Sequence, residues 1–159
     1  LHSHMLVVLP EYRDTDAGFQ LKMAQRDKAL ARGISLIEWT FDPLEVKNAY
    51  FNIEKVGAVA RQYLPNHYGT TTSRLQNGLP TDRLVVEWHI ARERMKPVIE
   101  ARIPVPSDIS EIKSSNPVQA RALQDRTRER FQELFASGMT VVGFERTKES
   151  GVYLLGRMK

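Results

Sequence analysis

The spacing of apolar residues predicts alternating strands and helices in the first third of the chain. Residues 5–9 form a short apolar run closed by Pro10, which predicts a buried strand. Residues 15–32 have helical spacing, and Gly33 follows in the position that favours a left-handed cap. Residues 34–41 are rich in branched and aromatic side chains, which predicts a second strand.

A second helix and a third strand are predicted next. Asp42 is placed to cap the helix, with Pro43 in its first turn and Glu45 able to reach back as in a capping box. Gly57 ends this helix, and residues 58–64 follow as a strand. The order strand, helix, strand, helix, strand implies an α/β sheet with crossover helices.

The middle of the chain reads as a surface loop followed by two strands. Residues 69–82 are polar and rich in turn formers, so we predict a loop at the surface. Residues 83–91 alternate apolar and polar side chains with the two-residue period of a strand. A charged link then leads to another strand at residues 98–105.

The C-terminal part predicts a helix and a hairpin. Asn116 precedes Pro117 and caps a long helix whose inward positions repeat at helical spacing: Ala120, Leu123, Thr127, Phe131 and Leu134. Residues 139–147 and 152–158 pair as a hairpin. We therefore expect residues 96–159 to pack as a strand-helix-hairpin unit on the same mixed central sheet as residues 1–95, with flanking helices and one compact α/β (α+β) domain.

Composition narrows the class of protein. The chain has 159 residues, 42% of them hydrophobic, which suffices for one substantial core. It has no cysteine, which excludes disulfides and thiolate metal sites, and its apolar runs are far shorter than the roughly 20 residues of a membrane-spanning helix. With no signal-peptide pattern in the sequence, we expect a cytoplasmic protein without a membrane partner.

Charge adds little. The formal net charge is +4 and the pI is near 9.5, which mildly favours anionic ligands. Basic residues on the predicted C-terminal helix are interleaved with acidic ones, as in a solvated, ion-paired face: Arg121, Asp125, Arg126, Arg128, Glu129, Arg130 and Glu133. Without a single-sign stripe or a recognised motif, we do not expect nucleic-acid binding.

The first residues allow two interpretations. Ser3, His4 and Met5 resemble the remnant of a cleaved affinity tag, or the whole stretch is native strand. We favour native strand. A buried-type strand without preceding neighbours has an open edge, so we predict that the chain self-associates, as a homo-oligomer, or relies on its C-terminal region.

Two motifs resemble the GNAT superfamily of acyl-coenzyme A N-acyltransferases. Residues 8–13, Val-Leu-Pro-Glu-Tyr-Arg, are similar to the opening of its signature, a strand ending in Val-x-Pro before Arg/Gln-x-x-Gly-x-Gly/Ala and a helix. Residues 53–58, Ile-Glu-Lys-Val-Gly-Ala, are similar to Tyr-x-Lys-x-Gly-Phe at the end of its fourth helix. The resemblance covers residues 4–69. Residues 98–158 then either complete the family's sheet or add on to it.

The resemblance implies transfer of an acetyl or other acyl group from coenzyme A to the amine of a small molecule or a protein. It places the backbone of Val8 beside the pantetheine arm and lets Asn48 bond the pantetheine amide. It gathers four residues around the pyrophosphate: Arg13, Thr15, Ala17 and Gly18. Asp14 and Asp16 stand where the family prefers glycine, and their charges oppose the dianionic ligand, so we predict weak cofactor binding.

The general acid that the family uses is absent from its usual position in this sequence. The family's usual general acid is a tyrosine on the fourth helix, and its position holds Ile53, which cannot donate a proton. Tyr50, one turn earlier, is the candidate that replaces it, with Tyr63 and Tyr68 as alternatives. Each of these tyrosines also suits an amphipathic core position.

Candidate bases and metal ligands are few. Glu38 and His4 lie on predicted strands and can accept the proton of the amine. His2 and His4 form a spaced pair, but without a third ligand we expect no metal site. The alternative function is a GNAT-like domain that has lost catalysis and serves as a binding or assembly module.

Overall fold

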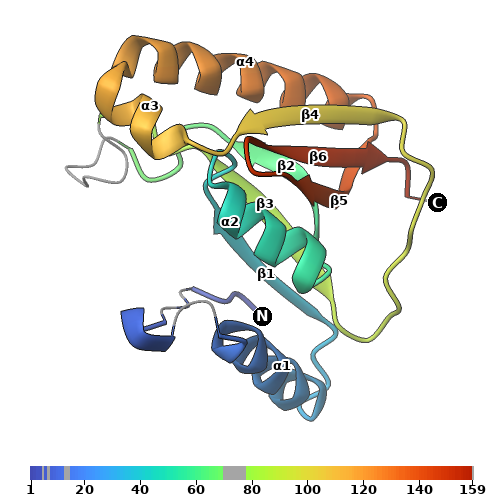
Figure 1. Cartoon of the computed structure of the whole chain (residues 1–159). Helices are drawn as coiled ribbons and strands as arrows, with labels where there is room; N and C mark the ends of the chain where they lie inside the picture. Colours follow the sequence, from blue (N-terminus) through green and yellow to red (C-terminus); the bar gives the residue numbers. More distant parts are fainter. Residues whose placement is uncertain (5, 7, 13–14, 70–77, 159) are drawn as a thin grey trace.

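Mixed α/β architecture is seen in a computed structural model that describes residues 1–4, 6, 8–12, 15–69 and 78–158. These residues contain six strands: β1 (Leu36–Phe41), β2 (Val59–Leu64), β3 (Arg83–His89), β4 (Ala101–Pro106), β5 (Thr140–Arg146) and β6 (Ser150–Gly156). The strands form one sheet in the order β1-β3-β2-β5-β6-β4, and each neighbouring pair is antiparallel (Figure 1). The predicted combination of one sheet with flanking helices is confirmed. The predicted mixed sheet with crossover connections is wrong for these six strands, because β3 lies between β1 and β2 and pairs antiparallel with both.

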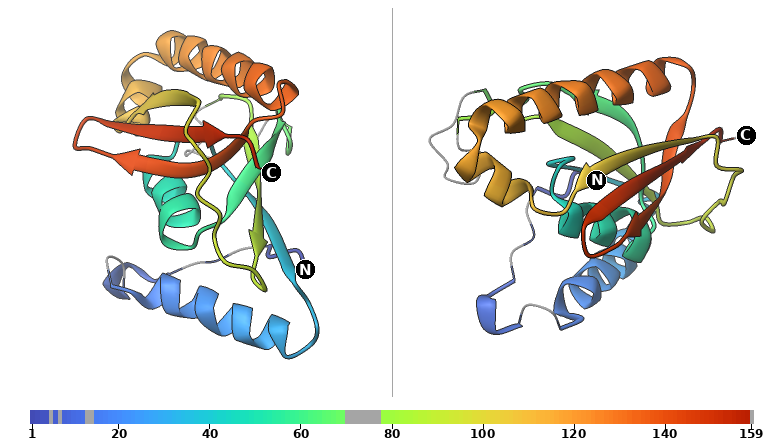
Figure 2. Two further views of the ribbon diagram at one scale, coloured as in Figure 1. Left: turned by 90° about the vertical axis from the view of Figure 1, so that its right-hand side faces the viewer. Right: turned by 45° about the horizontal axis from the view of Figure 1, so that its top comes forward.

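The helices lie at opposite ends of this sheet and beside it. They are α1 (Ala17–Leu30), α2 (Val46–Ala49) with its π-helical continuation η2 (Tyr50–Lys55), α3 (Ile109–Ser115) and α4 (Pro117–Ala136), besides a 3-10 turn η1 (Pro10–Tyr12). Figures 1 and 2 show α1 and α4 at opposite ends of the molecule. Helix α4 contacts β2 and β4, and η2 lies against β5.

The two parts of the chain share a sheet and a core. Strand β5 joins the sheet at β2, where Ala60 pairs with Val141. An aromatic stack crosses this junction: the ring centroids of Tyr63 and Phe131 are 5.6 Å apart, and those of Phe131 and Tyr153 are 5.0 Å apart. The C-terminal strands therefore extend the β2 side of the sheet, away from the edge at β1 where the N-terminal segment lies.

Several local signals act as predicted. Gly33 has a φ of 72° and follows the end of α1, a conformation that costs glycine little. Asn116 caps α4, its side-chain oxygen accepting from the backbone N–H of Gln119 at 3.1 Å. Along β3, the residues Leu84, Val86 and Trp88 are buried while the residues between them are partly exposed.

The first strand was misplaced by the sequence interpretation. The described residues of the run 5–9 form no strand, and Met5 and Val7 lie outside the description. Pairing occurs earlier, as a parallel bridge of His2 with Glu38, in which the Ser3 N–H donates to the Glu38 carbonyl at 2.8 Å. An apolar run does not by itself choose a pairing partner; the chain leaves β1 after Ser3 and enters η1 at Pro10.

The start of the second helix was also wrong. Helix α2 begins at Val46, and its N-cap Glu45 makes no side-chain cap bond. Asp42 instead accepts from the backbone N–H of Leu44 at 2.9 Å, and its other oxygen lies 3.3 Å from the Lys113 amine. The segment before α2 is therefore a turn held by a lysine from the C-terminal unit, a partner that no local pattern reveals.

The predicted surface loop is buried at its end. Residues 70–77 lie outside the described part of the chain, but Leu79, Thr81 and Asp82 are 5%, 1% and 1% exposed. The reason is that Thr81 and Asp82 hydrogen-bond within the protein, as described below, so their polarity does not place them in water.

Candidate functional site

A cleft opens where the N-terminal segment leaves β1. Its volume is about 240 Å³. Four parts of the chain line it, namely the N-terminal segment, α1, β1 and the α2–η2 helix: Ser3, His4, Leu6, Lys22, Trp39, Thr40, Phe41, Asn48, Phe51 and Asn52. Most of these side chains are aromatic or polar and uncharged, so a charged lysine among them stands out.

Lys22 is the unusual group of the cleft. It lies on α1 and is only 3% exposed. Its amine donates to Ser3 Oγ and to Gln25 Oε1, each at 3.2 Å, and lies 3.6 Å from the centre of the Trp39 ring. These partners are neutral, and no carboxylate of the described residues lies within ion-pair distance of Nζ.

Burial without a counter-charge changes the acidity of this amine. Desolvation lowers the pKa of Lys22 from 10.5 to about 8, because the neutral form is the easier one to bury. The cation–π contact with Trp39 stabilises the ammonium form and holds it in place. Near neutral pH Lys22 can therefore give up or regain a proton, as a proton-transfer group must.

The floor of the cleft is fixed by a buried hydrogen bond. The indole Nε1 of Trp39 donates to Asn52 Oδ1 at 3.1 Å. Asn52 lies in η2 and Asn48 in α2, four residues earlier, and both line the cleft. π-helical turns occur often at functional sites, and here the turn presents Asn52 to the tryptophan.

One of the predicted cofactor-binding residues and one candidate base line the cleft, and a further cofactor-binding candidate packs against Phe51 in its lining. Asn48 and the candidate base His4 line it. Gly18 lies against Val8 and Phe51, since a Cβ there would be 3.6 Å from Val8 Cγ2 and 3.7 Å from the Phe51 ring.

The remaining loop residues precede α1. Thr15 Oγ1 donates to the Tyr12 carbonyl at 2.6 Å and accepts from the Ala17 N–H at 3.3 Å, so it holds the turn into the helix. Arg13 and Asp14 lie outside the described residues. Asp16, at the N-cap of α1, makes no side-chain cap bond and pairs with Lys55 at 3.1 Å.

The predicted catalytic residues Glu38 and Tyr50 do not line the cleft. Glu38 alternates with the buried Ile37 and Trp39 along β1 and is in register with Glu87. Tyr50 is partly buried and packs against the hydrophobic core. The structure thus does not bring these two residues together in one site.

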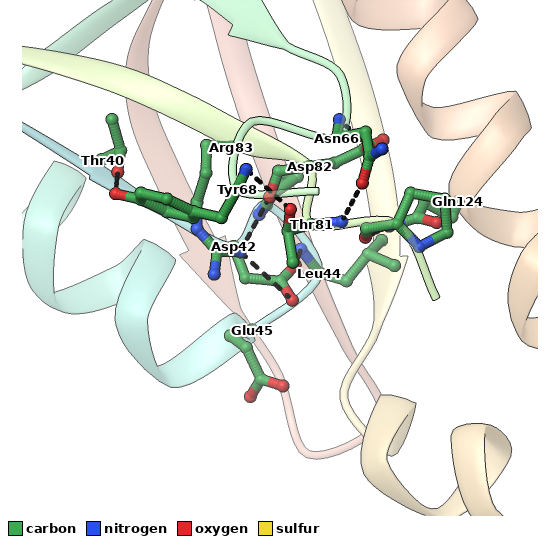
Figure 3. A network of polar contacts seen from close by, with 12 residues as sticks. Thr40, Asp42, Leu44, Glu45, Asn66, Tyr68, Thr81, Asp82, Arg83 and Gln124 are labelled. Carbon is green, nitrogen blue, oxygen red and sulfur yellow. Dashed lines mark hydrogen bonds and ion pairs between the residues drawn. The ribbon is translucent and has the colours of Figure 1, made fainter. Parts of the chain in front are cut away.

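A buried polar network supports the rim near the cleft (Figure 3). The carboxylate of Asp82 accepts from the Tyr63 hydroxyl at 2.7 Å, from the Asn66 N–H at 2.9 Å and from Arg128 Nε at 2.9 Å. Burial, and then Asp82, raises the pKa of Tyr63 well above its usual range. Burial alone would lower the pKa of Arg128, but Asp82 more than offsets this and raises it. Both groups therefore stay protonated at every ordinary pH.

The network reaches the cleft through Tyr68. Thr81 Oγ1 accepts from the Tyr68 N–H at 2.9 Å and donates to the Gly69 carbonyl at 3.0 Å. The hydroxyls of Tyr68 and Thr40 are 3.2 Å apart, and Thr40 lines the cleft (Figure 3). Tyr68, Gly69 and Thr81 are thereby connected to Thr40 in one wall of the cleft.

Sequence interpretation missed Lys22, although a signal was present. Gly18, Lys22, Gln25 and Ala29 follow helical spacing, and each is buried or partly buried. A polar pair in the middle of an inward face is informative, because a buried polar group must find partners. The prediction of this helix relied instead on a neighbouring face of it, which carries the apolar residues Phe19 and Met23.

The described residues were also compared with the requirements of a metal site and of a membrane-spanning helix. No group of three or more His, Cys, Asp or Glu side chains within the described part of the chain is placed to hold a metal ion, and the rings of His2 and His4 are 6.5 Å apart. Over the same residues, no helix combines the length and apolar character needed to cross a bilayer.

A scan against protein-family models, a search of curated proteins and a search of solved structures each returned no match.

Proposed function

We propose that the chain is a GNAT-like N-acyltransferase, which transfers an acetyl or other acyl group from coenzyme A to an amine. The observation that carries the proposal is the cleft between the N-terminal segment and β1, with His4, Lys22 and Asn48 in its walls. The order of elements around it, from the bridged N-terminal segment through α1, β1 and α2 to β2, agrees with the resemblance of residues 4–69.

In this proposal coenzyme A binds at the N-terminal end of α1. The first N–H groups of a helix lack intrahelical partners and attract phosphate. Gly18, in the first turn of α1, packs against Val8 and Phe51. Thr15 and Ala17 form the turn that leads into this helix end. In the proposal the pyrophosphate lies at this turn and the pantetheine arm runs past Val8 to Asn48.

The charge of Asp16 weakens this site less than the sequence indicates. Its carboxylate is 67% exposed and pairs with Lys55, itself 45% exposed, so it is directed toward η2. An exposed pair of this kind contributes only about 0–1 kcal/mol, so the neutralisation is partial. We therefore retain weak coenzyme A binding as part of the proposal.

Lys22 and His4 are the proton-transfer groups in this proposal. When the amine nitrogen attacks the thioester carbonyl, the C–N bond forms, the C–S bond breaks, the amine loses a proton and the thiolate gains one. A pKa of about 8 for Lys22 is close to the roughly 8.5 of an ordinary thiol, which suits proton donation to the departing sulfur. His4, in the same cleft, accepts the proton of the amine.

Release of free thiol from acetyl-coenzyme A in the presence of a panel of amines tests the proposal. Lys22→Met should lower kcat by roughly 10²–10⁴ if Lys22 transfers the proton. Lys28→Met removes an exposed lysine from the same helix and should leave kcat unchanged. Full activity of Lys22→Met, or no coenzyme A binding in a calorimetric titration of the unmodified protein, would contradict the proposal.

A binding module without catalysis is the second candidate. Ile53 is fully buried and aliphatic where the family places its acid, and Glu38 and Tyr50 do not line the cleft. Coenzyme A binding in the titration without thiol release for any amine would favour this candidate over the enzyme.

A further inference from the structure

A second and larger cavity, the basic groove, lies beyond the tryptophan pair. Its volume is about 540 Å³, within the range of small-molecule sites. It is bordered by α1, the end of η2, the end of β3 and the link after β3. Trp39 lines the cleft and Trp88 lines the groove, with their rings edge to face at 6.3 Å, so the two cavities are distinct.

The groove offers apolar surface to the body of a ligand. Phe19 and Met23 of α1 are only partly buried by the core, and Trp88 and Val56 complete this surface. Aromatic and thioether side chains of this kind adapt to flat or aliphatic ligands.

The polar lining of the groove is predominantly basic. It carries five cationic side chains, namely Arg26, Lys55, Arg61, Arg92 and Arg94, against three carboxylates, those of Glu54, Glu87 and Glu93. The formal excess is two positive charges, which attracts an anion.

Three of these cations already have partners. Arg94 binds Glu54 at 3.0 Å, Arg61 lies 3.3 Å from Glu87, and Lys55 pairs with Asp16. The side chains of Arg26 and Arg92, by contrast, make no hydrogen bond or ion pair with any residue that the structure describes. Two guanidinium groups thus remain for a ligand, and their fork of donors matches carboxylate and phosphate oxygens.

The Glu54 carboxylate in the wall behind them is already paired. Arg94 holds both carboxylate oxygens of Glu54 and also donates to the Val142 carbonyl at 3.0 Å. Burial would raise the pKa of Glu54, but Arg94 more than offsets it and lowers the pKa. The Glu54 charge is thereby directed to Arg94 and not into the groove.

We propose that the basic groove binds an amphiphilic anion, a small molecule with an apolar body and one carboxylate or phosphate group. The apolar body lies on Phe19 and Trp88, and the anionic group pairs with Arg26 and Arg92. This site is separate from the cleft and does not depend on acyl transfer.

Titration of the whole chain with 1-anilinonaphthalene-8-sulfonate, a fluorescent amphiphilic anion, tests the proposal. The Trp39→Phe variant leaves Trp88 as the single tryptophan, and we expect saturable binding with energy transfer from Trp88 to the probe. Arg26→Gln with Arg92→Gln should weaken binding by about tenfold or more, since both charged hydrogen bonds are lost.

A matched control removes two arginines elsewhere. Arg102→Gln with Arg121→Gln changes the net charge equally, at exposed sites where they pair with Glu145 and Asp125, and should leave the affinity unchanged. Equal weakening in both double variants, unchanged affinity in the groove variant, or non-saturable binding would overturn the proposal.

A further variant and a competition experiment complete the test. Met95→Glu places a carboxylate on a side chain that is 46% exposed in the groove, and it should also weaken binding; it serves if the double variant does not fold. Octanoate and adenosine monophosphate then compete with the probe. Displacement by octanoate identifies an aliphatic carboxylate as the ligand, and displacement by the nucleotide identifies a nucleoside phosphate, while displacement by neither contradicts the proposal.

Discussion

Two buried charges of this protein, Asp82 and Lys22, have opposite surroundings. They are equally hidden, at 1% and 3% exposed. Asp82 is held by the guanidinium of Arg128, a tyrosine hydroxyl and a backbone N–H, whereas Lys22 has only neutral partners and the face of Trp39.

This difference in surroundings distinguishes a charge that stabilises the fold from a charge that can exchange a proton. A buried charge with an opposite partner in place keeps its ionisation state, and it becomes costly only when the partner is removed. A buried charge without such a partner is already strained, and its pKa moves toward the neutral form. Asp82 therefore anchors Tyr63, Asn66 and Arg128 to one another, and Lys22 is a charge in the cleft that can exchange a proton.

Breaking the Asp82 network should have the largest effect. Arg128→Met leaves the Asp82 carboxylate buried without its counter-charge, and we expect the free energy of unfolding in urea to fall by about 3–5 kcal/mol. Asp82→Asn combined with Arg128→Met should recover a large part of this loss, because no lone charge remains. On the exposed face of the same helix, Arg121→Met should cost less than about 1 kcal/mol. Equal losses for Arg128→Met and Arg121→Met would show that Asp82 needs no partner.

Removing the buried charge of Lys22 should raise the free energy of unfolding, whereas breaking the Asp82 network should lower it. The folded pKa of about 8 lies below the ordinary 10.5, so between these values the unfolded chain binds more protons and stability rises with pH. Below pH 8 the folded protein bears the full cost of the buried ammonium. Lys22→Met should then raise the free energy of unfolding by roughly 1–3 kcal/mol at pH 7.

The pH profile is the sharper measurement for Lys22. The stability difference between Lys22→Met and the unmodified protein should shrink as the pH rises from about 8 to 10.5, and using the difference cancels the other titrating groups. Lys28→Met, on the exposed side of α1, should show no such change. A difference that stays constant over this range would mean that Lys22 is not strained.

Patterns among neighbouring residues predicted much of the fold, whereas the residues of the site depend on contacts with residues that are distant in the sequence. Gly33, Asn116 and the alternation along β3 act through neighbours a few positions away, and each was predicted from the sequence. Asp42 binds Lys113, which is 71 positions later, and so the start of α2 was misplaced. Lys22 is buried by Trp39 and Ser3, and no pattern within α1 states that these will meet it. The polar site residues could not be inferred until the sheet brought distant segments together.

An intermediate case is the half-exposed pair of Glu54 and Arg94. Arg94 lowers the pKa of Glu54 below 4.5, so the pair stabilises the fold above that value and this contribution is lost as the pH falls through the folded pKa. Because the Glu54 side chain is 41% exposed, we expect Glu54→Gln to cost at most about 1 kcal/mol at pH 7, and nothing once the carboxylate is protonated. Urea unfolding at pH 7 and at a series of lower pH values checks both expectations. A cost that does not change as the pH falls would mean that the ion pair does not stabilise the fold.

Asp16, which pairs with Lys55 at the N-cap of α1, is more exposed than Asp82, Lys22 or Glu54, and its removal should have the smallest effect. Asp16→Gly removes a negative charge beside the proposed pyrophosphate position and releases Lys55 toward it, so coenzyme A should bind more tightly. Because the Asp16 charge is exposed and already paired, the gain should be a few-fold, or less than about 1 kcal/mol. Asp108→Gly is a matched control, since Asp108 also stands at a helix N-cap without a side-chain cap bond, but at α3. Calorimetric titration of both variants decides between them. Tightening of a hundredfold in Asp16→Gly would show that Asp16 points at the ligand and not at Lys55, and an equal gain in Asp108→Gly would show that only net charge matters.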